Sequence, residues 1–147
     1  LQREGEADAA ALAERLLRSP EDGHVKLFVT SRSLALRQAR REVFERGAYV
    51  PVRVEGSREQ HVVAFARVLD GVAIVAVAGR FLARLGQLPV GPRAWGDTRL
   101  ALPAGLRAGG CVETLTGVEL PPAGETGLRV ADVLARLPVA LLAVGHG

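Results

Sequence analysis

The stretch FERGAYVPVRVEG, residues 44–56, decides the fold, because the spacing of its apolar side chains changes partway along it. Before Gly47, apolar residues recur at roughly the 3.6-residue spacing of a helix, and glycine is typical of helix ends. After it, Val50, Val52 and Val54 alternate with other residue types, which is the spacing of a strand with one buried face. The sequence therefore predicts that a helix ends at Gly47 and that a β domain begins there.

Two helices are predicted before this boundary. Apolar residues at helical spacing predict the first over residues 6–18. Ser19 can cap a second helix, and Pro20 suits its first position, because proline lacks the N–H that would be unpaired there. This second helix is predicted over residues 20–44, weakened by Gly23. The arginines at its end need no ligand to explain them, since cations there complement the helix dipole.

Strands account for most of the chain after this boundary. The apolar runs 61–68 and 72–78 are joined by Asp70 and Gly71, a strong hairpin signal, and Pro51 places the strand before them at a sheet edge. Further strands are expected at 97–103, with Thr98, Leu100 and Leu102 on one face, at 111–117, and within 128–144. A short helical turn is expected at 80–86, and loops at 87–96 and 118–127.

The order of these elements indicates an α+β fold. We expect two N-terminal helices, a segment spanning residues 1–46, followed by an antiparallel β-sandwich of about six or seven strands over residues 47–147. With 147 residues, the chain is long enough to bury a core without disulfide support.

The composition indicates a globular protein of a reducing compartment. Hydrophobic residues make up 48% of the sequence, which argues against disorder. The single cysteine, Cys111, permits no internal disulfide. The sequence contains no uncharged apolar run of about 18 residues and no leader-like start. A cytoplasmic protein without a membrane partner is therefore expected.

Positive charge leaves one alternative function open. The formal net charge is +3, and Lys26 is the only lysine. A nucleic-acid-binding domain would use the basic end of the second helix, which comprises Arg32, Arg37, Arg40, Arg41 and Arg46. Arginines throughout the chain are interleaved with carboxylates, as on an ordinary solvated surface, so no nucleic-acid partner is expected.

No set of residues in the sequence has the pattern of a catalytic or metal site. His24, His61 and His146 lie far apart, without cysteine or carboxylate partners at ligand spacing. Cys111 has no nearby histidine and is expected to be a small buried hydrophobe. We therefore assign no catalytic, cofactor-binding or metal-binding residue, and we expect no cofactor.

Two aromatic residues are candidates for sugar contact. Phe28 and Phe65 fall at core positions of the apolar pattern, which leaves Tyr49 and Trp95. A carbohydrate-binding module, in which these two rings stack on glucose, is a second alternative function. For Trp95 the competing interpretation is a ring that anchors a long loop onto the sheet, because covering apolar surface with so large a ring is favourable.

Several motifs together resemble a known enzyme family. In this order, the chain contains DGHVKLFVTSRSLALRQARREVFERGAYVPVRVEG (22–56), HVVAFAR (61–67), WGDTRLALP (95–103), TLTG (114–117) and ADVLARLPVALL (131–142). They resemble the carboxyl-terminal part of the maltooligosyl trehalose synthases, large enzymes of the α-amylase superfamily. The resemblance implies that the helical segment is the end of a catalytic barrel and that the sandwich is the one known as domain C.

The resemblance also implies a place in trehalose biosynthesis. Enzymes of this family are isomerases that convert the reducing-end α-1,4 linkage of a maltooligosaccharide to α,α-1,1 by intramolecular transglycosylation. Their catalytic carboxylates lie on barrel loops, so Asp97, Glu113 and Asp132 inherit no catalytic role. The chain alone is expected to be an inactive fragment that stabilises the barrel, its partner, and meets maltooligosaccharide only through the parent enzyme. Without the barrel, exposed helix residues such as Leu27 and Leu34 are expected to favour self-association.

One segment departs from the family pattern. The family has WRDLLTG or a similar sequence where this chain has CVETLTG, residues 111–117. A tryptophan would therefore stand at Cys111 and an aspartate at Glu113. The smaller Cys111 side chain is expected to change the packing of this strand.

Overall fold

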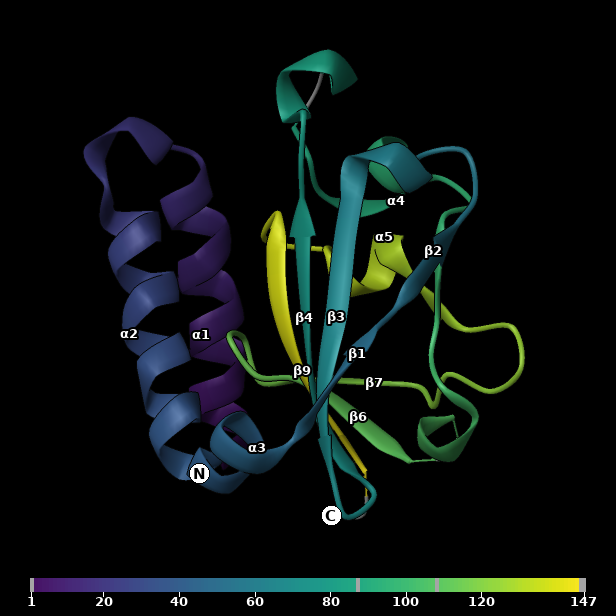
Figure 1. The fold of residues 1–147 in the computed structure, drawn as a ribbon. Coiled ribbons are helices and arrows are strands. Elements are labelled where there is room, and N and C mark those ends of the chain that lie inside the picture. Colours follow the sequence, from purple (N-terminus) through teal and green to yellow (C-terminus); the bar gives the residue numbers. More distant parts are fainter. Residues whose placement is uncertain (1, 87, 108, 146–147) are drawn as a thin grey trace.

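The computed structural model describes residues 2–86, 88–107 and 109–145, with side chains from Asp8 onward. Helices stand beside two antiparallel sheets (Figure 1). The larger sheet has six strands in the order β1 (Ala48–Pro51), β3 (Val62–Leu69), β4 (Val72–Gly79), β9 (Val139–Gly145), β6 (Gly110–Glu113) and β7 (Val118–Leu120). The smaller has the order β2 (Arg53–Glu55), β5 (Arg99–Ala101) and β8 (Leu128–Arg129). This architecture confirms the predicted α+β class.

Alternating residues of β3 separate the two faces of the larger sheet. Ala64 and Ala66 are buried in the core between the sheets, whereas Val63 and Phe65 lie on the outer face, toward the helices. The prediction that Phe65 is a core residue is therefore wrong. Its ring is half-buried and stacks on Tyr49, with 5.3 Å between ring centroids.

This placement changes the expected cost of removing the Phe65 ring. We expect Phe65→Ala to lower the free energy of unfolding by about 1–2 kcal/mol, because only part of the ring is withdrawn from water. Leu142→Ala on β9 removes a side chain that is 0% exposed, and should cost about 2–5 kcal/mol. Urea denaturation followed by circular dichroism measures both values. An equal or larger loss for Phe65→Ala would contradict the observed faces of β3.

The predicted hairpin is confirmed. Strands β3 and β4 pair from Val62 opposite Gly79 to Leu69 opposite Val72. Asp70 and Gly71 form the turn with φ angles of 51° and 78°, the left-handed conformation that tight hairpins require and that Asp-Gly supplies. Strand β1 lies at the edge of the sheet, as Pro51 predicted.

The predicted second helix is interrupted twice. The first predicted helix is confirmed as α1 (Gln2–Leu17). Residues 20–44, predicted as one helix, instead form a 3₁₀ turn, η1 (Pro20–Asp22), then α2 (His24–Ala39) and the start of α3 (Arg41–Arg46). Gly23, with φ of 78°, makes the first break, and the Asp22 carboxylate accepts the N–H of His24 at 2.9 Å. Arg40, with φ of −118°, makes the second. Ser19 makes no side-chain cap.

Gly47 follows α3, as expected, for a reason that the sequence did not indicate. Its φ of −64° and ψ of 145° are available to any residue, so glycine is not needed for its torsion angles. A Cβ there would collide with the carbonyl oxygen of Val43 and lie 3.2 Å from the backbone nitrogen of Val68. Gly47 thus lets α3 approach β3 closely. The division of the chain at residues 46 and 47 into two domains stays a prediction.

The strand predicted after Gly47 crosses from one sheet to the other. Strand β1 pairs with β3, whereas β2 pairs with β5. Val52 lies between them, buried, and its N–H donates to the Ala64 carbonyl at 3.1 Å. This crossing joins the edges of the two sheets and closes the core between them.

The segments predicted as loops contain short elements. Residues 87–96 include α4 (Gly91–Trp95), residues 118–127 begin with β7, and residues 128–144 contain β8, α5 (Val130–Val133) and β9. The remaining short turns are the 3₁₀ helices η2 (Glu59–His61), η3 (Leu82–Leu85) and η4 (Ala104–Leu106). Within the described ranges, every helix is too short or too polar to cross a bilayer. The cytoplasmic location stays a prediction.

Candidate functional site

The two predicted sugar-contact residues lie in different environments. Trp95, on α4, is 0% exposed within the core, and its Nε1–H donates to the Pro89 carbonyl at 3.1 Å. Because the buried indole offers no face to a ligand, Trp95 fits the second interpretation, a ring that anchors its loop, and not sugar stacking. Tyr49, on β1, is 61% exposed and lies on the outer face of the larger sheet. The structure therefore does not combine them into one stacking platform.

The three acids considered in the sequence each have a structural contact. Asp97 accepts hydrogen bonds from the backbone N–H and the hydroxyl of Ser57, at 3.0 and 2.6 Å, and these bonds lower the pKa of its carboxyl. Asp132 lies 4.0 Å from the Arg129 guanidinium. Glu113 and Asp132 both line one small cavity of about 10 Å³, which is room for about one water molecule and far too little for a sugar.

Glu113 is the most deeply buried of the three acids, at 5% exposed. Its Oε1 accepts the N–H groups of Leu115 and Leu141, at 3.1 and 3.2 Å. Its Oε2 accepts the N–H and hydroxyl of Thr116, at 2.9 and 2.6 Å. The carboxylate thus holds the turn after β6 against β9, and all of these bonds satisfy protein donors.

The two histidines that the structure describes each lie beside a protein oxygen. His24 Nδ1 lies 3.3 Å from the Asp22 carboxylate, and His61 Nδ1 lies 3.2 Å from the Arg80 carbonyl. His146 lies outside the described residues. Across the parts of the chain that the structure describes, no three His, Cys, Asp or Glu side chains are placed to hold a metal ion.

Cys111, on β6, is buried in the core, as the sequence predicted. Burial, together with the nearby Glu113 charge, raises the pKa of its thiol to about 11.

We expect the folded protein to show almost no reaction of Cys111 with a thiol-specific disulfide reagent at mildly alkaline pH, because the thiolate is the reactive form. The urea-unfolded chain should react completely. Fast labelling of the folded chain would contradict the buried position.

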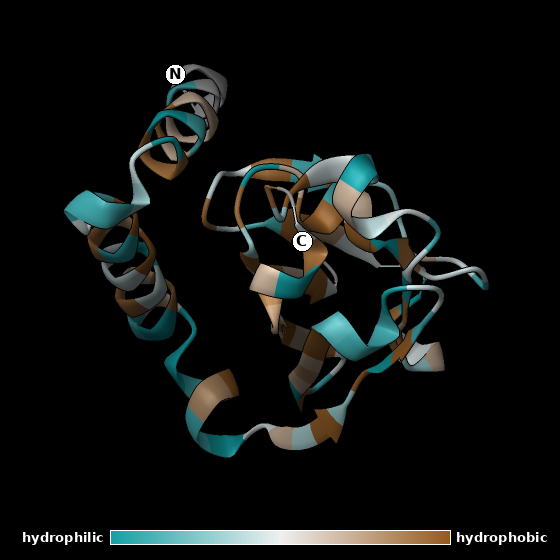
Figure 2. Cartoon of the chain, turned by 90° about the horizontal axis from the view of Figure 1, so that it is seen from above, coloured by the Kyte–Doolittle hydropathy of each residue, from teal (hydrophilic) through white to brown (hydrophobic). Residues whose placement is uncertain are grey.

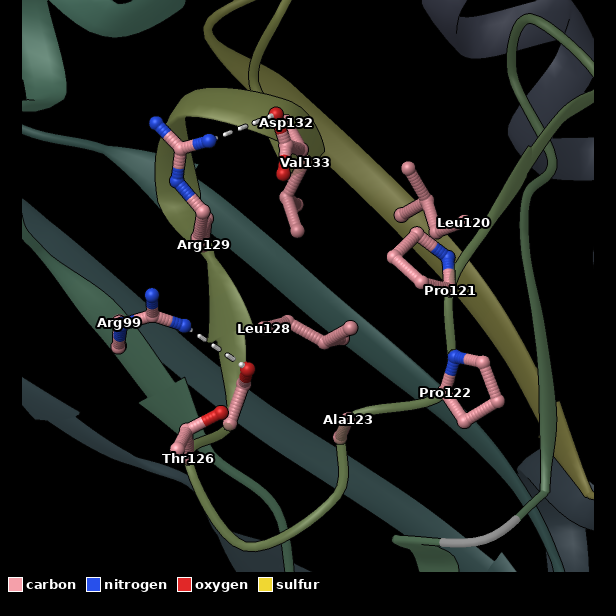
Figure 3. A pocket seen from close by; sticks show the side chains of 11 residues that line it. Arg99, Leu120, Pro121, Pro122, Ala123, Thr126, Leu128, Arg129, Asp132 and Val133 are labelled. Atoms are coloured by element: carbon pink, nitrogen blue, oxygen red, sulfur yellow. Dashed lines mark hydrogen bonds and ion pairs between the residues drawn. The ribbon is translucent and has the colours of Figure 1, made fainter.

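A pocket of about 170 Å³, lined by both polar and apolar residues, lies beside β8. Figure 3 shows Arg99 and Arg129 on one side and the proline pair at 121–122 across from them. Arg99 donates to the Gly127 carbonyl at 3.3 Å, and Arg129 is the partner of Asp132. Both guanidinium groups thus have neighbouring protein oxygens, and neither predicted sugar-contact residue lines this pocket.

The arginines of the basic helix end do not form one uniform surface. Arg32 donates to the Leu115 carbonyl at 3.0 Å and so ties α2 to the turn after β6. Arg41 pairs with Glu45 at 2.8 Å within α3. Arg37 lines a cavity between α2 and the larger sheet. Two of the five arginines considered for nucleic acid therefore make contacts within the protein.

An apolar groove lies between α2 and the outer face of the larger sheet. We call it the α2 groove. Its main cavity has a volume of about 410 Å³ and is lined by Ser33, Leu34, Arg37, Phe44, Phe65, Arg67, Ile74, Ala76 and Leu141. A smaller cavity of about 160 Å³ shares Ser33, Phe65, Ala76 and Leu141 and extends to Val63. In Figure 2 the helices form an arm beside the sandwich, with hydrophobic segments on both.

Large apolar side chains on α2 and on the outer face of β3 are open to solvent. Leu27 and Leu34, two turns apart on α2, are 67% and 60% exposed, and Val63 on β3 is 44% exposed. The exposure expected for Leu27 and Leu34 is confirmed. Sequence reasoning missed the groove itself, since it assigned Phe65 to the opposite face. One signal in the sequence could have shown this. Arg67 lies two positions after Phe65 on the same strand, so this charged residue shares a face with Phe65 and marks that face as the outer one.

Comparisons with known proteins agree on one enzyme. No family model matches the sequence. Two curated proteins from two strains of Mycobacterium tuberculosis, each named "Putative maltooligosyl trehalose synthase", are 36% identical over 119 residues, 81% of this chain. The chain spans only 14% of the length of these relatives.

A solved structure supports the same relationship. A mutant of maltooligosyltrehalose synthase from Arthrobacter ramosus matches with a TM-score of 0.63 and 31% sequence identity. The match covers 90% of this chain and 16% of that one. Sequence and structure thus both relate nearly the whole chain to a small part of that enzyme.

Proposed function

Since this chain is homologous to one part of the maltooligosyl trehalose synthases, we propose that it is the non-catalytic portion that carries domain C. In the complete enzyme it would pack against the catalytic barrel and stabilise it. The reaction would be conversion of the reducing-end α-1,4 linkage of a maltooligosaccharide to α,α-1,1, and the barrel would perform it. The chain would meet the sugar only as part of that enzyme.

The main support for this proposal is the apolar surface that the chain exposes. Leu34 on α2 and Val63 on β3 line the mainly apolar α2 groove and are exposed, and Leu27, two turns before Leu34 on α2, is exposed as well. Contiguous exposed apolar surface of this kind marks a site of contact with another protein surface. The relatives are several times longer than this chain, so they contain ample chain to cover it.

The contacts of the acidic residues support a non-catalytic role. A retaining sugar transfer uses two carboxyl groups about 5–5.5 Å apart, on either side of the scissile bond. Glu113 already accepts four hydrogen bonds from the protein, and Asp97 accepts two from Ser57. Asp132, paired with Arg129, also lines the pocket of about 170 Å³ beside β8, but no second carboxyl group is among the described residues that line that pocket. The chain alone is therefore expected to be inactive.

A replacement experiment tests this proposal. The 119-residue stretch of the mycobacterial relative that matches this chain is either deleted or replaced by the chain, and each protein is incubated with maltopentaose. We expect loss of reducing ends with the replaced enzyme, and none with the deleted enzyme or with the chain alone. Activity of the chain alone, or full activity and stability of the deleted enzyme, would refute the proposed role.

A further inference from the structure

We propose that the α2 groove is the docking site for an amphipathic helix from the remainder of the enzyme, one that places apolar side chains against Leu34 and Phe65 and a carboxylate beside Arg67. This inference rests on the proposed function and makes it specific. It assigns the contact to one surface of the chain and states the chemistry of the segment that fills it.

The shape and lining of the groove suit a helix. The floor is the outer face of the sheet, where Phe65, Ala76 and Leu141 lie on neighbouring strands in register. One wall is α2, with Leu34 at the rim. The main cavity has a volume of about 410 Å³. Apolar grooves between a helix and a neighbouring element commonly receive the apolar face of another helix.

The charges in the groove specify one polar feature of this helix. Arg67 lines the main cavity, and its Nη2 donates to the Phe44 carbonyl at 2.9 Å. Arg37 lines the same cavity, and none of the described residues that line it is acidic. A carboxylate on the incoming helix would complement both guanidinium groups.

The source of the helix follows from the lengths of the relatives. This chain spans 14% of the curated relatives and 16% of the solved one. The remainder of such an enzyme is held beside this surface by the covalent chain, which gives it a high effective concentration at the groove. A second copy of this chain lacks that advantage and would have to bind from solution.

A pair of matched substitutions tests the inference in the replaced enzyme described above. Leu34 lines the groove and is 60% exposed, whereas Leu88 is 59% exposed and lies by α1, outside the groove. Leu34→Asp should lower the Tm of the replaced enzyme by at least about 2 °C, and Leu88→Asp should leave it unchanged. In the chain alone, both substitutions should have little effect, because both side chains already contact water.

A third variant tests the carboxylate. Arg67→Met removes the bond to Phe44 in the chain alone and in the replaced enzyme alike. We expect a larger fall in Tm in the replaced enzyme, and we expect this extra fall to shrink at high salt. Equal falls in both proteins would overturn the assignment of a carboxylate partner to Arg67.

The outcomes separate this inference from the proposed function. If the replaced enzyme is active and Leu34→Asp affects it no more than Leu88→Asp does, the groove assignment fails and the proposed function survives. If the replaced enzyme neither folds nor acts, both fail. Sedimentation velocity of the chain alone tests whether a second copy of the chain fills the groove instead. A dimer of the chain that Leu34→Asp dissociates, with no effect in the replaced enzyme, would assign the groove to a second copy and overturn the inference.

Discussion

Replacing Glu113 with alanine should lower the free energy of unfolding by about 3–5 kcal/mol. The substitution removes a carboxylate that is 5% exposed and accepts four hydrogen bonds. The N–H groups of Leu115, Thr116 and Leu141 would then stay buried without these acceptors, and each such group costs about 1–3 kcal/mol. Urea denaturation monitored by circular dichroism measures the loss.

Two further variants control for charge and for position. Glu113→Gln keeps one carbonyl oxygen, so about half of the accepting bonds survive, and we expect an intermediate loss. Glu119→Ala removes the exposed carboxylate of neighbouring β7 and should change stability by no more than about 0.5 kcal/mol. A Glu113→Ala protein as stable as Glu119→Ala would mean that the turn after β6 finds other acceptors at no cost.

Local pattern was enough to predict the hairpin and the strand at residues 97–103. In both, the information lies within a few neighbouring residues: the Asp-Gly turn between two apolar runs, and the alternation that buries Thr98, Leu100 and Leu102. These elements have the same periodicity whatever lies around them. Their prediction therefore does not depend on knowing the rest of the fold.

Phe65 shows where local pattern is insufficient. Strand β3 has apolar residues on both faces, so its sequence does not say which face meets the second sheet. That depends on the crossing at Val52, which carries the chain into the second sheet and places it over Ala64 and Ala66. The α2 groove is non-local for the same reason, since residues from two helices and three strands line it.

The break in the second helix at Arg40 has no evident signal in the sequence. The break at Gly23 does have one, because glycine accepts the left-handed conformation observed there. Glu113 was identified only as a departure from a family pattern, since its acceptor role depends on the turn at Leu115 and on β9 beside it. Tertiary contacts therefore determine the role of Glu113.

Replacing Trp95 with alanine should also cost about 3–5 kcal/mol, the usual loss for removing a large aromatic ring from a core. The indole is 0% exposed, and its Nε1–H fixes the Pro89 carbonyl at 3.1 Å. It packs so closely on β4 that a Cβ at Gly79 would lie 3.2 Å from its Cη2 atom. Because Trp95 is the only tryptophan, the unfolding of the variant must be followed by circular dichroism.

Tyr49→Ala is the control for Trp95, since this ring is 61% exposed and should cost no more than about 1 kcal/mol. A buried Trp95 also implies that maltooligosaccharides at millimolar concentration leave the tryptophan fluorescence of the wild-type chain unchanged. If that fluorescence shifted with sugar while Trp95→Ala unfolded at the wild-type urea concentration, the ring would be a binding surface. With a large loss of stability and no shift, its role is to hold the loop before α4 on the core.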